Sequence, residues 1–117
     1  MRIVVQRVSA ARVEVGGKIA GEIGTGLLVL AGFEVSDGEA DIDWMAGKLV
    51  RLRIFADADG VMNQSVQDID GEILAVSQFT LYASTKKGNR PSWSRAAPGE
   101  ISQPLFERFV DRLQGLL

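Results

Sequence analysis

The chain has 117 residues, of which 46% are hydrophobic and 24% are charged, and its formal net charge is −2. These values predict one folded domain over residues 1–117 and exclude a disordered chain, and the negative charge argues against a general nucleic-acid coat protein. The sequence has neither cysteine nor histidine, which excludes a disulfide framework, a thiol nucleophile, a Ser-His-Asp triad and a His/Cys zinc site made by this chain alone.

The sequence also lacks a pattern typical of export or membrane insertion. The first seven residues become polar again after three apolar ones, and no apolar run approaches the roughly 18 residues that a spanning helix needs. We therefore expect a cytoplasmic protein without a membrane partner.

The first quarter of the chain is predicted to form strands. Val and Ile recur from Arg2 to Val15, and Gly16-Gly17 can supply the positive φ angles of a tight hairpin that leads into Lys18–Ile23. This pattern indicates a β-meander. After a turn at Gly24–Gly26, the unbroken apolar run Leu27–Ala31 is typical of a strand covered on both faces and predicts the central strand of a sheet.

Two helices and further strands are predicted in the rest of the chain. Ser36 followed by Glu39 matches a capping box, and apolar residues at helical spacing then predict a helix from about Gly38 to Leu52. Pro104, taken as a first helical residue, precedes the apolar face of a second helix. Short strands are expected at Arg53–Phe55 and Glu72–Gln78. Together these elements predict an α/β fold, with a mixed, barrel-like β-sheet packed with two helices.

Two groups of acidic residues have simple structural explanations. Asp57-Ala58-Asp59-Gly60 lacks the third acidic ligand of a calcium loop, and its glycine comes too early, so we expect a solvated turn. Glu39, Asp41 and Asp43 fall near the start of the predicted helix, where acids complement the helix dipole. We predict no metal site.

A polar cluster follows the last predicted strand, where Ser77, Gln78, Phe79 and Thr80 succeed an apolar run. Residues at a strand end can line a cleft for an ester, with Ser77 or Thr80 positioning the substrate. The backbone N–H groups of Phe79 and Thr80 would then hold an oxyanion. A strand that simply ends in a hydroxyl-rich turn is the alternative interpretation.

The segment from Ser84 to Arg95 is the only strongly basic part of the chain. It contains four cations and no acid, and an aromatic residue lies at each side: Lys86, Lys87, Arg90, Arg95, Tyr82 and Trp93. Lys and Arg contact phosphate groups and aromatic rings stack on unpaired bases, so this pattern indicates an RNA contact. A solvated loop is the alternative.

Six segments spread over the chain resemble the D-aminoacyl-tRNA deacylase family: Met1–Val8, Gly24–Leu30, Leu52–Phe55, Met62–Ser65, Ser77–Leu81 and Lys87–Ser92. The resemblance implies the deacylase-like fold and a homodimer with its active sites at the subunit interface. It implies hydrolysis of the ester of D-aminoacyl-tRNA, and of glycine mischarged on tRNA, for translation quality control without a cofactor. It also places Ser77–Thr80 in the pocket and gives the terminal 2′-hydroxyl of the tRNA a part in catalysis.

The sequence departs from the family at its C-terminal side. Family members carry a Gly-cis-Pro dipeptide there that rejects L-amino acids and that Arg7 helps to orient, whereas no Gly-Pro pair occurs in this sequence. A fragment, a native truncation and completion by another polypeptide are all compatible with this. We expect Arg7, Lys86, Lys87 and Arg90 to contact the substrate. Two alternatives to the hydrolase stay open, namely a module that binds the tRNA acceptor end without catalysis and a dimeric scaffold.

Overall fold

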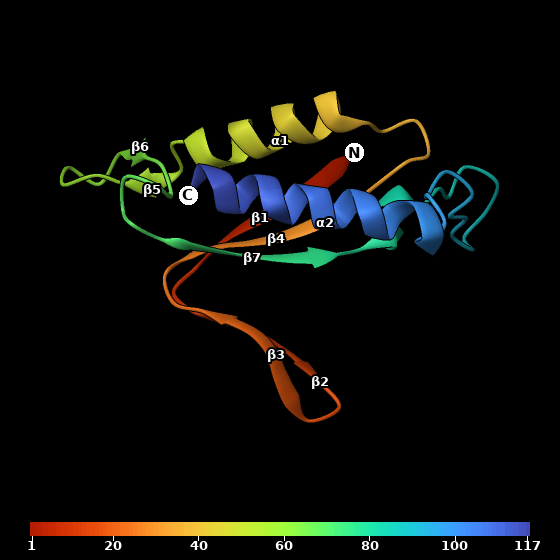
Figure 1. Cartoon of the computed structure of the whole chain (residues 1–117), viewed down its shortest axis with the longest axis horizontal. Helices are drawn as coiled ribbons and strands as arrows, with labels where there is room; N and C mark the ends of the chain where they lie inside the picture. Colours follow the sequence, from red (N-terminus) through yellow and green to blue (C-terminus); the bar gives the residue numbers. More distant parts are fainter.

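A three-stranded sheet lies at the centre of the computed structural model, which describes all residues from 1 to 117 (Figure 1). Its order is β1-β4-β7. β1 (Arg2–Val8) runs antiparallel to β4 (Gly26–Gly32), and β7 (Glu72–Ser77) runs parallel to β4. The strand predicted from the apolar run Leu27–Ala31 is therefore confirmed as the central one.

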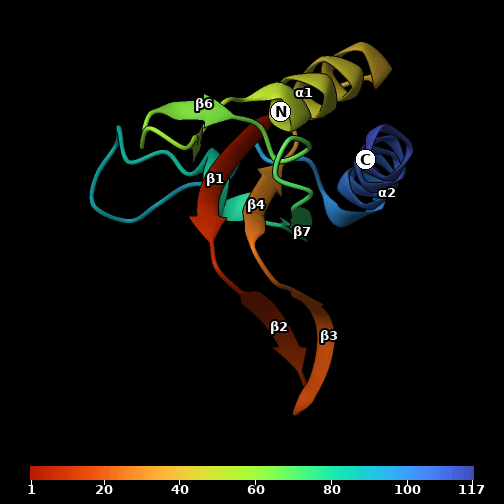
Figure 2. The same ribbon diagram turned by 90° about the vertical axis from the view of Figure 1, so that its left-hand side faces the viewer.

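Both helices cover the same face of this sheet. α1 (Glu39–Arg51) and α2 (Gly99–Leu116) lie side by side in both views (Figures 1 and 2). Alternate residues of β4 point to one face of a pleated sheet, and Leu27, Val29 and Ala31 are almost completely buried there. They form one hydrophobic core with residues of the two helices, including Ile42, Leu49, Phe109 and Leu113.

The β2–β3 hairpin projects from the body of the molecule (Figure 2). β2 (Ala11–Val15) pairs with β3 (Lys18–Ile23), and Gly16 and Gly17 have φ angles of 58° and 78°, so the predicted hairpin is confirmed. The predicted meander is wrong because β1 pairs with β4 instead of β2. This non-local pairing places Ile3 and Val5 against the core, which a pairing with the projecting hairpin would not do.

The remaining strands are short. β5 (Phe55–Ala56) and β6 (Met62–Gln64) form a separate two-stranded sheet, and only β5 overlaps a strand predicted from the sequence. A 3-10 helix, η1 (Phe79–Tyr82), follows β7. The α/β class with a mixed sheet and two helices is confirmed, with the strands divided among three sheets. Neither helix has the length and apolar character needed to cross a membrane.

The first helix begins where the sequence predicted it but has a different cap, and the second helix begins earlier than predicted. α1 follows Gly38, whose N–H donates to the Asp41 carboxylate at 2.9 Å, so the expected pairing of Ser36 with Glu39 is wrong. In the expected and in the observed cap alike, an acidic side chain three residues after the capping residue accepts a hydrogen bond from the N–H of that residue. α2 begins at Gly99, and Pro104 lies inside it instead of at its first position. The preceding turn is helical because Ile101 packs against the hydrophobic core.

Candidate functional site

The polar cluster lies where the two parallel strands end. Ser77 is the last residue of β7 and pairs with Ala31 of β4, so both carboxyl ends meet at one edge of the sheet. η1 then packs across the end of β4, next to Gly32. A Cβ atom at Gly32 would lie 2.9 Å from the backbone oxygen of Gln78, which means that only glycine leaves room for η1 in this position.

Within the cluster, the side chains of Gln78 and Thr80 contact each other. The Gln78 N–H donates to the Ala31 carbonyl at 2.7 Å, and its side-chain amide donates to Thr80 Oγ1. Phe79 and Thr80 begin the helical turn, so no carbonyl within the turn accepts from their N–H groups. Ser77 and Phe79 are exposed. The turn thus combines two hydroxyls, an amide and two backbone donors at the surface.

The cluster contains no general base for Thr80. Its hydroxyl hydrogen-bonds the amide of Gln78, and no carboxylate or amine forms a hydrogen bond with it. A threonine hydroxyl needs an activating base to act as a nucleophile. The geometry therefore suits binding and orienting a substrate better than covalent catalysis by Thr80.

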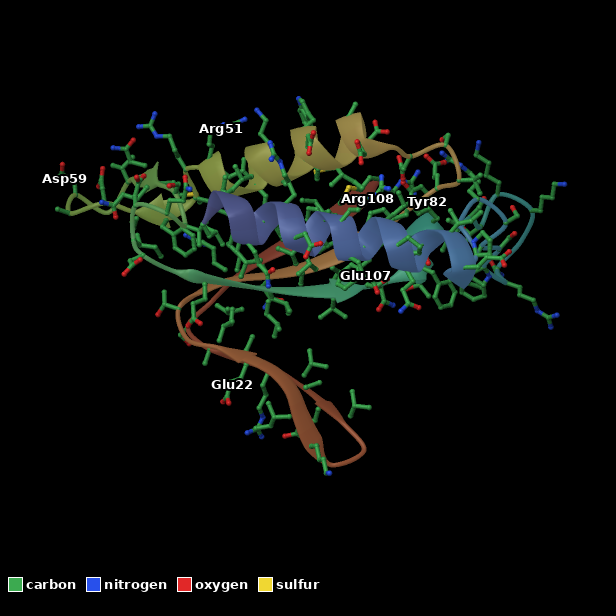
Figure 3. All side chains as sticks on the ribbon, in the orientation of Figure 1. Glu22, Arg51, Asp59, Tyr82, Glu107 and Arg108 are labelled. Atoms are coloured by element: carbon green, nitrogen blue, oxygen red, sulfur yellow. The ribbon has the colours of Figure 1, made fainter.

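Tyr82 anchors η1 to the rest of the protein, at the end of the molecule that also holds the basic loop (Figure 3). Its ring is buried, with the guanidinium of Arg2 4.5 Å and that of Arg95 5.7 Å from the ring centroid. Arg2 also donates to the Leu81 carbonyl at 3.0 Å. Contact of the ring with two cations fixes the orientation of the turn that carries Thr80.

The surroundings of Tyr82 keep its phenol protonated. Burial raises the pKa of Tyr82 to about 12, and the negative charges of Asp37 and Glu34 act in the same direction. The two arginines oppose this effect without cancelling it. The tyrosine is consequently a neutral structural group at physiological pH and does not supply a base to the site.

Two ion pairs complete this anchor. Arg95 binds Glu34 at 2.6 Å, and the N-terminal amine of Met1 binds Asp37 at 2.6 Å in a buried pair. The second oxygen of Asp37 accepts the Glu34 N–H at 2.7 Å. The sequence did not predict the roles of Glu34 and Asp37 in these ion pairs, because their partners lie 61 and 36 positions away and no local pattern marks them.

The basic segment forms a loop closed at its base. Ser84 and Ser92 exchange two backbone hydrogen bonds of 2.7 and 2.8 Å, and Lys86, Lys87 and Arg90 are exposed between them. The fourth predicted cation, Arg95, differs from these three because Glu34 neutralises it. Three exposed cations therefore stand on the loop beside η1.

The two aromatic residues beside this loop have opposite environments. Tyr82 is buried in the anchor described above, so it offers no face to a ligand. Trp93 is 40% exposed and its ring meets that of Phe79 edge to face, with centroids 5.8 Å apart.

Arg7 does not join the cluster within one chain. It pairs with Leu27 at one end of the sheet, whereas Ser77 pairs with Ala31 at the other end. Four residues along a strand correspond to roughly 13 Å. The Arg7 guanidinium instead donates to the Ile54 carbonyl at 2.9 Å.

The acidic groups also have structural partners. Glu39 and Asp43 of α1 pair with Arg108 and Arg112 of α2 at 2.8 and 3.1 Å, across the contact between the helices. Asp57 accepts hydrogen bonds from its own turn, and the N–H of Val61 is the main cause that lowers its pKa. These carboxylates serve local structure away from the polar cluster.

Comparison with known proteins identifies the family. The family model described as D-Tyr-tRNA(Tyr) deacylase matches residues 4–117. The chain belongs to this family. The D-aminoacyl-tRNA deacylase of Dechloromonas aromatica (strain RCB) is 74% identical over 117 residues, which are all of this chain and 78% of that relative. The deacylase of Chromobacterium violaceum is 62% identical over the same shares of the two chains.

Solved structures share the fold of this chain. A c-Myc DNA unwinding element binding protein superposes with a TM-score of 0.93 at 39% identity, over 99% of this chain and 78% of that one. A probable eukaryotic D-amino acid tRNA deacylase superposes with a TM-score of 0.78 over 96% of this chain and 66% of its own. Its 21% identity supports the fold alone.

Proposed function

We propose that the chain, like the deacylases to which it is related, hydrolyses the ester that joins a D-amino acid to tRNA. The observation that carries the proposal is the polar turn at the carboxyl ends of β4 and β7, directly beside a loop with three exposed cations. An ester site next to a phosphate-binding surface fits a substrate in which an amino acid is attached to the end of an RNA.

In this proposal the residues of the turn have separate tasks. The N–H groups of Phe79 and Thr80 stabilise the oxyanion that forms when the ester is attacked. Thr80, whose hydroxyl is held by the amide of Gln78, orients the substrate, and Ser77 contacts it from its exposed position at the end of β7. The 2′-hydroxyl of the terminal ribose supplies the reactive group that this chain lacks, since it has no histidine or cysteine.

The cations bind the RNA. Lys86, Lys87 and Arg90 are exposed on a loop that begins two residues after η1, so they are placed to contact phosphates near the ester. Arg7 lies at the far end of the sheet, and we propose that it contacts substrate held mainly by a second copy of the chain.

A homodimer is part of the proposal. The face of the sheet opposite the helices carries an apolar row in which Val4, Leu30 and Val76 lie in register across three strands. Val4 is 49% exposed, so one chain does not cover this row. The apolar strand β4, in contrast, is covered on its helical face by the chain's own helices and needs no partner there.

We extend the proposed substrates to glycine mischarged on tRNA, and the setting to translation quality control in the cytoplasm, where charged tRNA is used. The family resemblance supports these extensions. Clearing such tRNAs requires only hydrolysis, so no cofactor is included.

The test measures the release of D-tyrosine, glycine and L-tyrosine from charged tRNA, together with tRNA affinity. We expect release of D-tyrosine and glycine by the wild-type chain. Tight tRNA binding without any release would overturn the hydrolase proposal in favour of a binding module. If the folded protein neither binds tRNA nor releases an amino acid, only the scaffold interpretation remains.

A further inference from the structure

The most exposed aromatic surface next to the polar turn is the ring pair of Phe79 and Trp93. Phe79 is 57% exposed and Trp93 is 40% exposed, although each is large enough to stabilise a core if buried. The two rings meet at an interplanar angle of 70°, which leaves a face of each available while each supports the other. An apolar surface kept at the protein surface by such a contact is typical of a binding site.

The charge around this ring pair favours a nucleic acid. Trp93 follows Ser92 at the base of the loop that carries Lys86, Lys87 and Arg90, and no acidic residue lies between Ser84 and Ser94. Bases stack on aromatic rings while neighbouring cations neutralise the phosphates, which is how single strands are held.

The position of Phe79 specifies which base reaches the ring pair. Phe79 precedes Thr80 in η1 and contributes one of the two N–H groups assigned to the oxyanion. The ester is carried by the terminal ribose, so the base of that same nucleotide lies within one nucleotide of Phe79.

We propose that Phe79 and Trp93 form a stacking platform for the unpaired terminal base of the tRNA. The inference rests on the proposed function and adds Trp93 as a residue that positions the substrate. It predicts that affinity depends on the base itself, in addition to the phosphates that the loop cations contact.

The chain provides a matched control in its second tryptophan. Trp44 lies on α1 and is 62% exposed, but the Lys48 ammonium lies 5.5 Å from the centroid of its ring and its helix begins with Glu39 and Asp41. Trp44 thus has comparable exposure without the basic loop. The sequence has only these two tryptophans, so each can be observed alone.

The experiment uses an uncharged RNA hairpin that ends in a single-stranded CCA, and the same RNA with an abasic terminal nucleotide. In the Trp44→Phe variant we expect Trp93 to show the fluorescence emission of a solvent-exposed indole. The CCA hairpin should quench this emission, and the abasic hairpin should quench it less. Trp93→Ala should weaken binding of the CCA hairpin by about 5- to 100-fold, and Trp93→Phe by much less because a ring remains. Trp44→Ala should leave affinity unchanged.

The platform would be overturned by emission from Trp93 that the RNA does not change, by equal affinity of wild type and Trp93→Ala, or by an equal loss on Trp93→Ala for both RNAs. Trp93→Ala could instead lower kcat/KM for D-tyrosyl-tRNA but not for D-alanyl-tRNA, with unchanged RNA affinity. That result would assign the rings to the side chain of the amino acid and would also overturn the platform.

These readouts separate the inference from the proposed function. Base-dependent quenching by a chain that releases no amino acid would support the platform and contradict the hydrolase. Release of D-tyrosine that Trp93→Ala does not change would support the hydrolase and contradict the platform.

Discussion

At the scale of single residues, the environment of a side chain decides its chemistry more than its type does. Thr80 is the hydroxyl that its sequence position makes the first candidate for a nucleophile. In the structure its oxygen hydrogen-bonds the amide of Gln78, and no base activates it. A sequence without histidine predicts the same lack of an activating base.

We therefore expect Thr80→Ala to retain much of the activity. Losing one positioning hydrogen bond costs roughly 0.5–1.5 kcal/mol, or about tenfold in kcat/KM at most. A substrate with a 2′-deoxy terminal ribose should lose far more, because no side chain replaces that hydroxyl. Steady-state deacylation with both substrates measures this, with Thr25→Ala, an exposed threonine at the other end of the sheet, as control. Trapping a covalent adduct on Thr80 by mass spectrometry would contradict the expectation.

Tyr82 gives a prediction about pH. Its pKa in the folded protein is about 12, above its ordinary value of 10.0, so the neutral phenol stabilises the fold below pH 10. That contribution should decline as the pH rises from about 10 to about 12. Phenolate absorbance reports this residue alone because the chain has one tyrosine, and denaturant unfolding at several pH values reports stability.

The control for this titration is Tyr82→Phe, which keeps a ring beside Arg2 and Arg95 and removes the ionising group. The wild type should lose stability relative to this variant as the pH rises from about 10 to about 12. Phenol ionisation centred near pH 10 in the folded protein would refute the buried environment of the ring.

At the scale of elements, the ends of helices and strands depend on contacts that lie outside the local sequence. Proline is common at the first position of a helix, which is why Pro104 was expected there. Yet α2 extends one and a half turns earlier, since Ile101 has a place in the core. Likewise β7 continues as η1 only because Gly32 on the neighbouring strand leaves space for it.

The basic loop is the element whose function is most directly measurable. Replacing Lys86 and Lys87 together by Ala should weaken tRNA binding. It should also reduce the slope of log K against log salt concentration by about 1.4–1.8, because fewer counterions are released when two phosphate contacts are lost. Affinity measured over a series of salt concentrations gives this slope. The double variant Lys18→Ala and Lys48→Ala, which removes two exposed lysines elsewhere, is the control. An unchanged slope would favour a merely solvated loop.

At the scale of the whole molecule, the second face of the sheet leads to a prediction about assembly. Val4 is half exposed at one end of the apolar row that it forms with Leu30 and Val76. We expect a homodimer at micromolar concentration, and we expect Val4→Lys to weaken it by at least about tenfold because it buries a charge without a partner. Sedimentation equilibrium measures both.

Two comparisons make this test specific. Val15→Lys changes a valine that is also exposed, at 67%, but lies in the projecting hairpin, and it should leave the dimer intact. A cooperative thermal unfolding transition of monomeric Val4→Lys would show that this variant is folded and that the substitution affects assembly. A wild-type chain that sediments only as monomer would refute the dimer.

The sequence by itself determined the features that depend on local periodicity and composition. The central strand at Leu27–Ala31, the Gly16-Gly17 hairpin and the helix after Gly38 follow from the spacing of apolar residues and from glycine's access to positive φ. The absence of histidine and cysteine restricted the chemistry, and Ser77–Thr80 and the basic segment were found as candidates, which stay proposals.

The tertiary structure decided what depends on residues distant in sequence. Three contacts join segments that share no local pattern: the pairing of β1 with β4, the contact of Arg2 and Arg95 with the ring of Tyr82, and the pairing of Arg95 with Glu34. Burial and charge neutralisation arise only when these segments meet. For that reason Tyr82 became an anchor and Trp93 an exposed ring, although the sequence placed both beside the same loop.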